Sequence, residues 1–132
     1  MRQIILGSLV RQARGTELLR QLLREEHVLL RAGQPDKVAG QEMSIQELIR
    51  QLVREREFLA QFLVREGFGK LADFLEGLDE AERRAFETWR ARVIVGEQES
   101  ALQSSVNADL AMALWKQSGA LLNHFQTQVA PK

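Results

Sequence analysis

The longest helical pattern in the chain lies in its C-terminal half, over residues 80–126, where no proline interrupts it. Asp79 precedes this segment, and its side chain can accept hydrogen bonds from the free amides of a first helical turn. Phe86, Trp89 and Val93 then recur at spacings of three and four residues, which is typical of one face of an α-helix. The pattern therefore predicts a long C-terminal helix.

A second apolar face follows in the same segment, after a polar stretch over residues 96–105. Its members are Val106, Leu110, Leu114, Leu121 and Phe125. At about 100° per residue, this face does not continue the first one. Either the helix breaks near Gly96, or it is continuous and changes its packing partner there. Continuity is favoured, because a single interior glycine costs only ~1 kcal/mol.

A broad apolar face predicts a first helix over residues 3–32. This face consists of Ile5, Leu9, Leu18, Leu19, Leu22, Leu23, Leu29 and Leu30. The helix is expected to end at Gly33, which can adopt a left-handed cap, and Pro35 cannot continue it. Gly15 is an interior weak point, so the first turns are expected to fray or to form a separate piece.

The sharpest local signal in the sequence predicts the start of a second helix, over residues 45–66. Ser44 and Glu47 have the spacing of a capping box, in which each side chain bonds to the backbone amide of the other residue. Residues 34–43 before it are expected to form a connector. A short helix over residues 70–76 then leads to the long C-terminal helix.

These elements predict an all-α fold in a single domain of 132 residues. We expect an antiparallel helical bundle, an elongated and coiled-coil-like three-helix hairpin with a long C-terminal helix. Glu26 and Arg56 interrupt the apolar faces of the first two helices, and symmetry about the connector places Glu26 near Gln51. Such long side chains commonly reach solvent from a helix edge. The alternative is a specific polar contact with the third long helix.

The charge balance argues against several classes of partner. The 18 basic and 18 acidic residues cancel, so no bulk field favours nucleic acid or an anionic membrane. No apolar run approaches the roughly 20 residues of a membrane span, so we expect no membrane insertion. The absence of cysteine excludes disulfides and thiolate chemistry and fits a reducing compartment, so a cytoplasmic location is expected.

The basic residues leave one alternative open, because most of them are arginines and several lie in the first predicted helix. A nucleic-acid-binding helical module is therefore conceivable. Glu17, Glu25 and Glu26 are interleaved with these arginines, and few aromatic residues accompany them. This arrangement favours ion pairs along the helix surface over binding of RNA or DNA.

No catalytic or cofactor-binding motif is found in the sequence. His27 and His124 are the only imidazoles, and they lie in different predicted helices without an acidic or thiol companion at metal-ligand spacing. Neither a dinucleotide-binding pattern nor a P-loop occurs. The chain is therefore interpreted as a non-enzyme without a metal or a cofactor.

The last predicted helix carries more apolar surface than one packing face requires. Trp115 and Leu122 lie to one side of its second apolar face, and Met112 lies further round, so about half of the circumference is apolar. This surplus either covers another helix of the same chain or holds an amphipathic helix of a partner in a groove.

Two stretches resemble the flagellar export chaperones of the FlgN type. The run from Leu22 to Gly33, LLREEHVLLRAG, resembles the first helix of that family and its exit. The run from Ser105 to Leu114, SVNADLAMAL, resembles the family's asparagine-containing stretch before its last apolar turns. The resemblance implies a cytoplasmic chaperone of flagellar type III export. Such proteins bind the amphipathic C-terminal helices of hook–filament junction (hook-associated) proteins, prevent their premature assembly and deliver them to the export apparatus.

By this resemblance and the apolar surplus, partner binding is assigned as a hypothesis to six residues of the last helix. They are Leu110, Leu114, Trp115, Leu121, Leu122 and Phe125. A homodimer is possible in this interpretation. The alternatives are a self-associating coiled-coil scaffold protein and, less favoured, the nucleic-acid-binding module.

Overall fold

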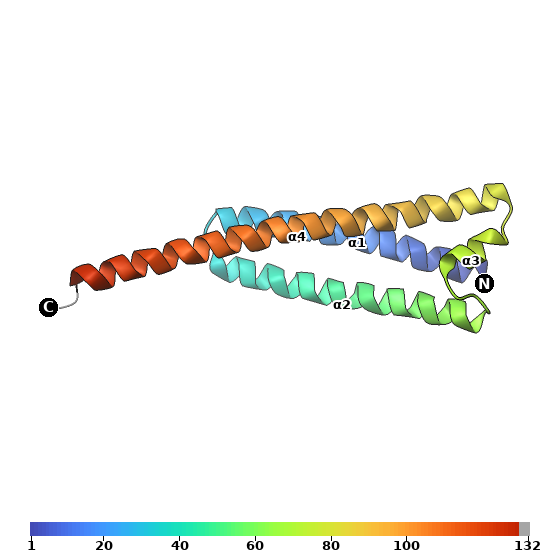
Figure 1. The fold of residues 1–132 in the computed structure, drawn as a ribbon, viewed down its shortest axis with the longest axis horizontal. Coiled ribbons are helices and arrows are strands. Elements are labelled where there is room, and N and C mark those ends of the chain that lie inside the picture. Colours follow the sequence, from blue (N-terminus) through green and yellow to red (C-terminus); the bar gives the residue numbers. More distant parts are fainter. Residues whose placement is uncertain (130–132) are drawn as a thin grey trace.

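The computed structural model describes residues 1–129, with the backbone alone for residues 121, 122 and 124–129. It confirms the all-α fold, because the described residues form helices and no strand. The helices are α1 (Arg2–Arg31), α2 (Pro35–Arg65), α3 (Leu71–Glu76) and α4 (Glu80–Val129). They form an elongated bundle in which α1 and α2 make an antiparallel hairpin and α4 runs parallel to α1 (Figure 1).

The hairpin turn between α1 and α2 is tight, and it corrects the predicted start of the second helix. Gly33 has a φ of 65°, a left-handed conformation that glycine adopts without steric cost, and this ends α1. Pro35 opens α2, because proline fixes a helical φ and needs no amide partner in the first turn. Residues 34–43 are therefore not a connector. Ser44 lies inside α2, where its hydroxyl donates to the carbonyl of Gly40 at 3.4 Å.

The earlier start of α2 also changes which residues of the hairpin face each other. Gln41 of α2 donates from Nε2 to the carbonyl of Leu22 at 2.9 Å and to Glu25 at 3.0 Å. Glu26 consequently lies beside Glu42, and the predicted position near Gln51 is wrong. The symmetry argument failed because it placed the centre of the hairpin within residues 34–43.

The long helix α4 is continuous through Gly96, as the sequence indicated. Gly96 is a packing position, because a Cβ atom there would lie 2.7 Å from the Cβ of Thr16 on α1. Gly15 has the same role against α2, where an added Cβ would lie 2.5 Å from Cδ2 of Leu52. The first turns of α1 are neither frayed nor a separate piece, since α1 begins at Arg2. Both glycines allow close approach of neighbouring helices.

The main apolar core lies at the end of the bundle where α3 is found. Its buried members are Ile5, Leu9, Leu59, Leu63, Phe74, Leu75, Leu78 and Phe86. Phe74 of α3 lies edge-on to Phe68 and Phe86, with ring centroids 5.5 and 5.3 Å apart. These edge-to-face contacts are a favoured aromatic geometry. The short helix α3 thereby joins α2 and α4 at this end.

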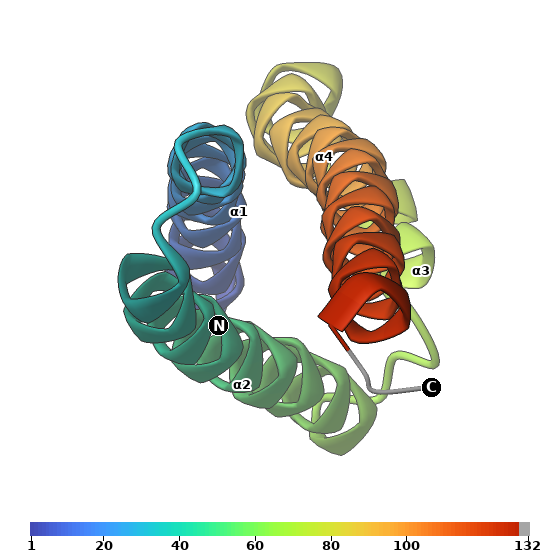
Figure 2. The same ribbon diagram turned by 90° about the vertical axis from the view of Figure 1, so that its left-hand side faces the viewer.

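Away from α3, the two outer helices do not pack against each other. Both α2 and α4 pack on α1, yet no Cα of α2 lies within 8 Å of a Cα of α4 in the described part of the chain. Viewed along its length, the bundle has α2 and α4 on separate sides of α1, with an opening between them (Figure 2). The last turns of α4 project past the hairpin turn (Figure 1).

Candidate functional site

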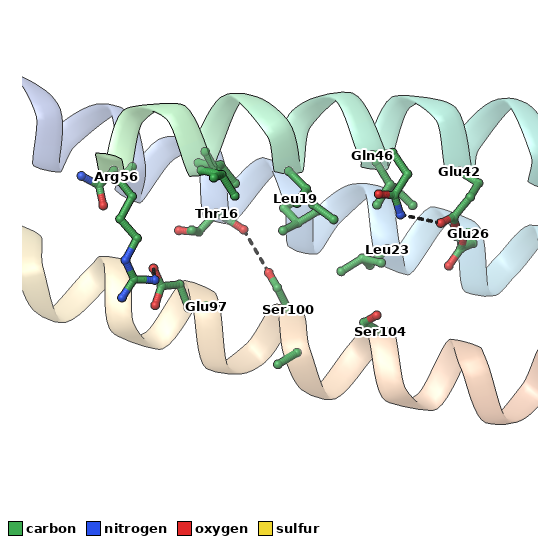
Figure 3. Close-up of a pocket in the computed structure, with 16 residues that line it drawn as sticks. Thr16, Leu19, Leu23, Glu26, Glu42, Gln46, Arg56, Glu97, Ser100 and Ser104 are labelled. Carbon is green, nitrogen blue, oxygen red and sulfur yellow. Dashed lines mark hydrogen bonds and ion pairs between the residues drawn. The ribbon is translucent and has the colours of Figure 1, made fainter. Parts of the chain in front are cut away.

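The opening between α2 and α4 contains two adjoining hollows, which together we call the cleft. The inner hollow, of about 420 Å³, lies nearer to α3. Its apolar lining comprises Leu19 and Leu23 of α1, Ile45, Ile49, Leu52 and Val53 of α2, and Ala101 of α4. Figure 3 shows side chains of all three long helices directed into this hollow. Its floor is α1 and its two walls are α2 and α4.

The outer hollow, of about 930 Å³, lies between the hairpin turn and α4. Its apolar lining comprises Leu30, Pro35, Val38 and Ala39 from the hairpin, and Ala108, Ala111, Leu114 and Trp115 from α4. Glu26, Glu42 and Ser104 line both hollows, so the cleft is continuous at these residues. From Glu97 to Ser118 the α4 wall is roughly 30 Å long at 1.5 Å per residue.

Two carboxylates meet where the hollows join (Figure 3). Glu26 is only 6% exposed and is hydrogen-bonded to Glu42. Burial, followed by this hydrogen bond, raises the pKa of Glu26 to about 7, whereas a hydrogen bond from Asn107 opposes the rise. Hydrogen bonds with Glu26 and Gln46 lower the pKa of Glu42. The opposite shifts of the two pKa values favour a proton on Glu26 below about pH 7, where it is shared with an ionised Glu42.

Asn107 of α4 holds Glu26 in place and fixes the register of α4 on α1. Its Nδ2 donates to the carbonyl of Leu23 at 2.7 Å and to Oε1 of Glu26 at 2.8 Å. Its Oδ1 accepts from Gln103 at 3.0 Å and lies 3.1 Å from Nδ1 of His27. The expectation that Glu26 reaches solvent is therefore wrong, and the alternative of a polar contact with the long helix is confirmed. A buried carboxyl requires such partners.

Arg56, the second charge on an apolar face, behaves differently. Its guanidinium pairs with Glu97 across the cleft, at 3.4 Å, and its side chain remains 73% exposed. The arginine thus reaches solvent from the helix edge, as expected of a long charged side chain. This ion pair lies at the inner end of the cleft and links α2 directly to α4.

The structure brings together part of the predicted binding residues. Leu114 and Trp115 line the outer hollow, and Trp115 is 72% exposed, so no helix of the described chain encloses it. Leu110 is half-buried and does not line the cleft. The side chains of Leu121, Leu122 and Phe125 lie outside the described residues.

The sequence interpretation missed the contribution of α2 to the cleft. Ile45, Ile49, Leu52 and Val38 form a wall of it, and none of them had been predicted to bind a partner. The apolar face of the second helix is broad, but its excess over the area covered by α1 becomes visible only in three dimensions. Ser104 and Ala101 of α4 carry no signal by themselves, because small exposed residues are common on helices.

The described residues carry neither a cluster of metal ligands nor a membrane-spanning helix. They contain no group of three or more histidine, cysteine, aspartate or glutamate residues that could hold a metal ion. Among these residues, no helix is both long enough and apolar enough to cross a membrane. The site is a cleft with many apolar lining residues, a pair of carboxyls where its two hollows join and an ion pair at its inner end.

The chain was compared with known proteins at the levels of family, sequence and structure. It matches no protein-family model, no curated protein and no solved structure.

Proposed function

We propose that the protein is a non-enzymatic binding protein of the chaperone type, which holds an amphipathic helix of a partner in the cleft. One observation carries this proposal: α2 and α4 both pack on α1, but they do not pack against each other. In a four-helix bundle, a fourth helix occupies this position and covers the apolar faces of its neighbours. Binding of an amphipathic helix in a groove uses the same packing between chains.

The chain itself supports a helix as the occupant. At the closed end of the bundle, α3 lies near both α2 and α4 but has no Cα within 8 Å of a Cα of α1. There α3 stands in the position of a fourth helix and inserts Phe74 and Leu75 into the core. The helix α3 ends at Glu76. Beyond it, the place of a fourth helix along the bundle is occupied by the cleft. A partner helix of about 20 residues matches the roughly 30 Å of the α4 wall.

The resemblance to flagellar export chaperones supplies the finer part of the proposal. The partner helices are then the amphipathic C-terminal helices of hook–filament junction proteins. The protein covers these helices in the cytoplasm, prevents premature assembly and delivers them to the export apparatus. Two observations support this: the resembling stretch around Asn107 forms the joint between α1 and α4, and Trp115 beyond it is exposed beside the cleft.

A co-purification experiment with junction-protein C-terminal segments tests the proposal. Ser104 is exposed and lines both hollows, so Ser104→Trp fills the cleft without disturbing the interior of the bundle. The matched control is Ser105→Trp, because Ser105 is exposed on the same helix and lines neither hollow. We expect Ser104→Trp to abolish co-purification and Ser105→Trp to retain it. Equal retention by both variants would contradict binding in the cleft.

Light scattering on the same samples separates this function from self-association. The proposal expects a complex containing the added segment. A closed oligomer of this chain that ignores every added segment would favour the scaffold interpretation. A homodimer that dissociates when the segment is added agrees with a cleft that a second copy covers weakly.

A further inference from the structure

The carboxyl pair of Glu26 and Glu42 lies at the point where both hollows of the cleft meet, away from the Arg56–Glu97 ion pair at the inner end. No lysine or arginine of the described chain forms an ion pair with either carboxyl. Neutral groups contact the pair instead: Asn107 donates to Glu26, and Gln46 donates to Glu42 at 2.9 Å. The negative charge of the pair is therefore not balanced by a cation in the free protein.

Other titratable groups near this point come from the hairpin helices. Glu25 and His27 flank Glu26 on α1, and His27 lies against Asn107. From α4, the wall at this level consists of the uncharged Ser104, Asn107 and Ala108. No side chain of α4 can thus neutralise the pair from the side opposite α2. A charged group that faces the pair in the bound state has to come from the occupant of the cleft.

When no partner is bound, the Glu26–Glu42 pair can keep a proton between its two carboxyls. Two carboxyl groups that are hydrogen-bonded to each other do not both ionise readily, because a shared proton removes the repulsion between two negative charges. When a partner helix covers the cleft, water leaves and the cost of an unbalanced charge rises. A cation can replace the proton and form charge-assisted hydrogen bonds to both carboxylates, which are stronger than hydrogen bonds between neutral groups.

We propose that the helix bound in the cleft carries a lysine or arginine in the middle of its apolar face, and that Glu26 and Glu42 bind this cation. This inference rests on the proposed function and adds partner selection to it. An apolar side chain at the same place covers the pair without satisfying it, and an acidic side chain is repelled. Selection against such helices matters, because apolar faces alone do not distinguish one amphipathic helix from another.

The carboxyl pair lies near the middle of the cleft, so the proposed need for a central lysine or arginine does not depend on the direction of the bound helix. The α4 wall runs from Glu97 to Ser118, and Asn107, which holds Glu26, lies close to its midpoint. The central residue of a partner helix therefore reaches the pair in either the parallel or the antiparallel orientation.

Three designed peptides test the inference by calorimetric titration of the full chain. Each is an amphipathic helix of about 21 residues, which spans the cleft at 1.5 Å per residue, and they differ only in a central lysine, methionine or glutamate. We expect the lysine peptide to bind the wild-type protein at least about tenfold more tightly than the methionine peptide. The glutamate peptide is expected to bind most weakly.

The matched variant carries Glu26→Gln and Glu42→Gln, which keep the size and the hydrogen-bonding capacity of the pair. We expect the lysine peptide to lose at least about tenfold in affinity for this variant, whereas the methionine peptide binds as well as to the wild type or better. Titrations in buffers of different ionisation enthalpy give a second readout. At pH 6, the lysine peptide should release up to about one proton from the wild type and none from the variant.

The outcomes separate the inference from the proposed function. If the three peptides bind the wild type equally and Ser104→Trp blocks them all, the cleft binds helices but the acid pair does not select among them. The inference is then overturned and the proposed function is retained. If no peptide binds, or if Ser104→Trp does not weaken binding, the proposed function itself is contradicted.

Discussion

At the scale of single residues, Glu26 has the environment that responds most strongly to pH. Its carboxyl keeps its proton to about pH 7 in the folded protein, because it is buried and shares a hydrogen bond with Glu42. In the unfolded chain it ionises near 4.5, its ordinary value. Between these values the folded state binds more protons than the unfolded state, so the free energy of unfolding falls as the pH rises. The lowered pKa of Glu42 acts below 4.5, outside this window.

We therefore expect Glu26→Gln to flatten the pH dependence of stability between about pH 4.5 and pH 7. The wild type should lose stability relative to the variant by up to about 1.4 kcal/mol per pH unit in the steepest part of this range. Urea unfolding at a series of pH values measures this difference, and titrating groups that do not interact with Glu26 cancel in the comparison. Parallel stability curves for the two proteins would show that Glu26 is not held protonated.

At the scale of helices, the fold depends on close approach at two glycines. Gly96→Ala places a methyl group against Thr16 and forces α4 away from α1. We expect it to lower the free energy of unfolding by about 1–3 kcal/mol, although alanine is the better helix former. Thermal unfolding followed by circular dichroism measures the change.

Gly40→Ala is the matched control for that change and also tests the start of α2. Gly40 lies inside α2, and an added Cβ there would meet nothing within 4 Å. We expect this variant to gain up to ~1 kcal/mol from helix propensity alone. A gain requires residues 34–43 to be helical in solution. No gain, or a loss, would instead favour the connector that the sequence pattern predicted.

The elements could be predicted from the sequence where the signal is local. Four helices, the continuity of α4 and the ends of α1 follow from periodicity and from Gly33. The start of α2 could not be predicted, because a proline such as Pro35 is common both just after the end of one helix and at the first position of the next. The Ser44 and Glu47 spacing also occurs on the surface of helices. Gly15 and Gly96 look like weak points in a single helix, and only the neighbouring helices reveal them as packing positions.

The candidate site could be predicted only in part, for the same reason. The exposure of Trp115 follows from the excess width of the apolar surface on α4. Ile45 and Ile49 line the cleft only because α2 and α4 do not pack against each other, and this separation is a property of the whole bundle. The partnership of Glu26 with Asn107 and Glu42 depends on the hairpin register, which the misplaced start of α2 had shifted.

At the scale of the whole molecule, the position of Trp115 allows a test of the proposed binding in the cleft. It is largely exposed in the free protein and lines the outer hollow. We expect Trp115→Ala to weaken binding of a junction-protein helix about tenfold or more, because tryptophans buried at interfaces often contribute about 2 kcal/mol or more. Helicity should not change. Met112→Ala is the control, since Met112 is also exposed but lines neither hollow.

The absence of cysteine from the chain makes site-directed disulfide formation a direct test of the cleft. The measurement uses a series of junction-protein C-terminal helices, each with a single cysteine at a different position along the helix, and four single-cysteine variants of this protein. Val53→Cys and Ala101→Cys place thiols on the two walls of the cleft, whereas Met43→Cys and Leu102→Cys place them on exposed surfaces outside it. A helix held between α2 and α4 should form disulfides with Val53→Cys and Ala101→Cys and not with the other two variants. Disulfides with Met43→Cys or Leu102→Cys, and none in the cleft, would contradict the binding of a fourth helix between α2 and α4.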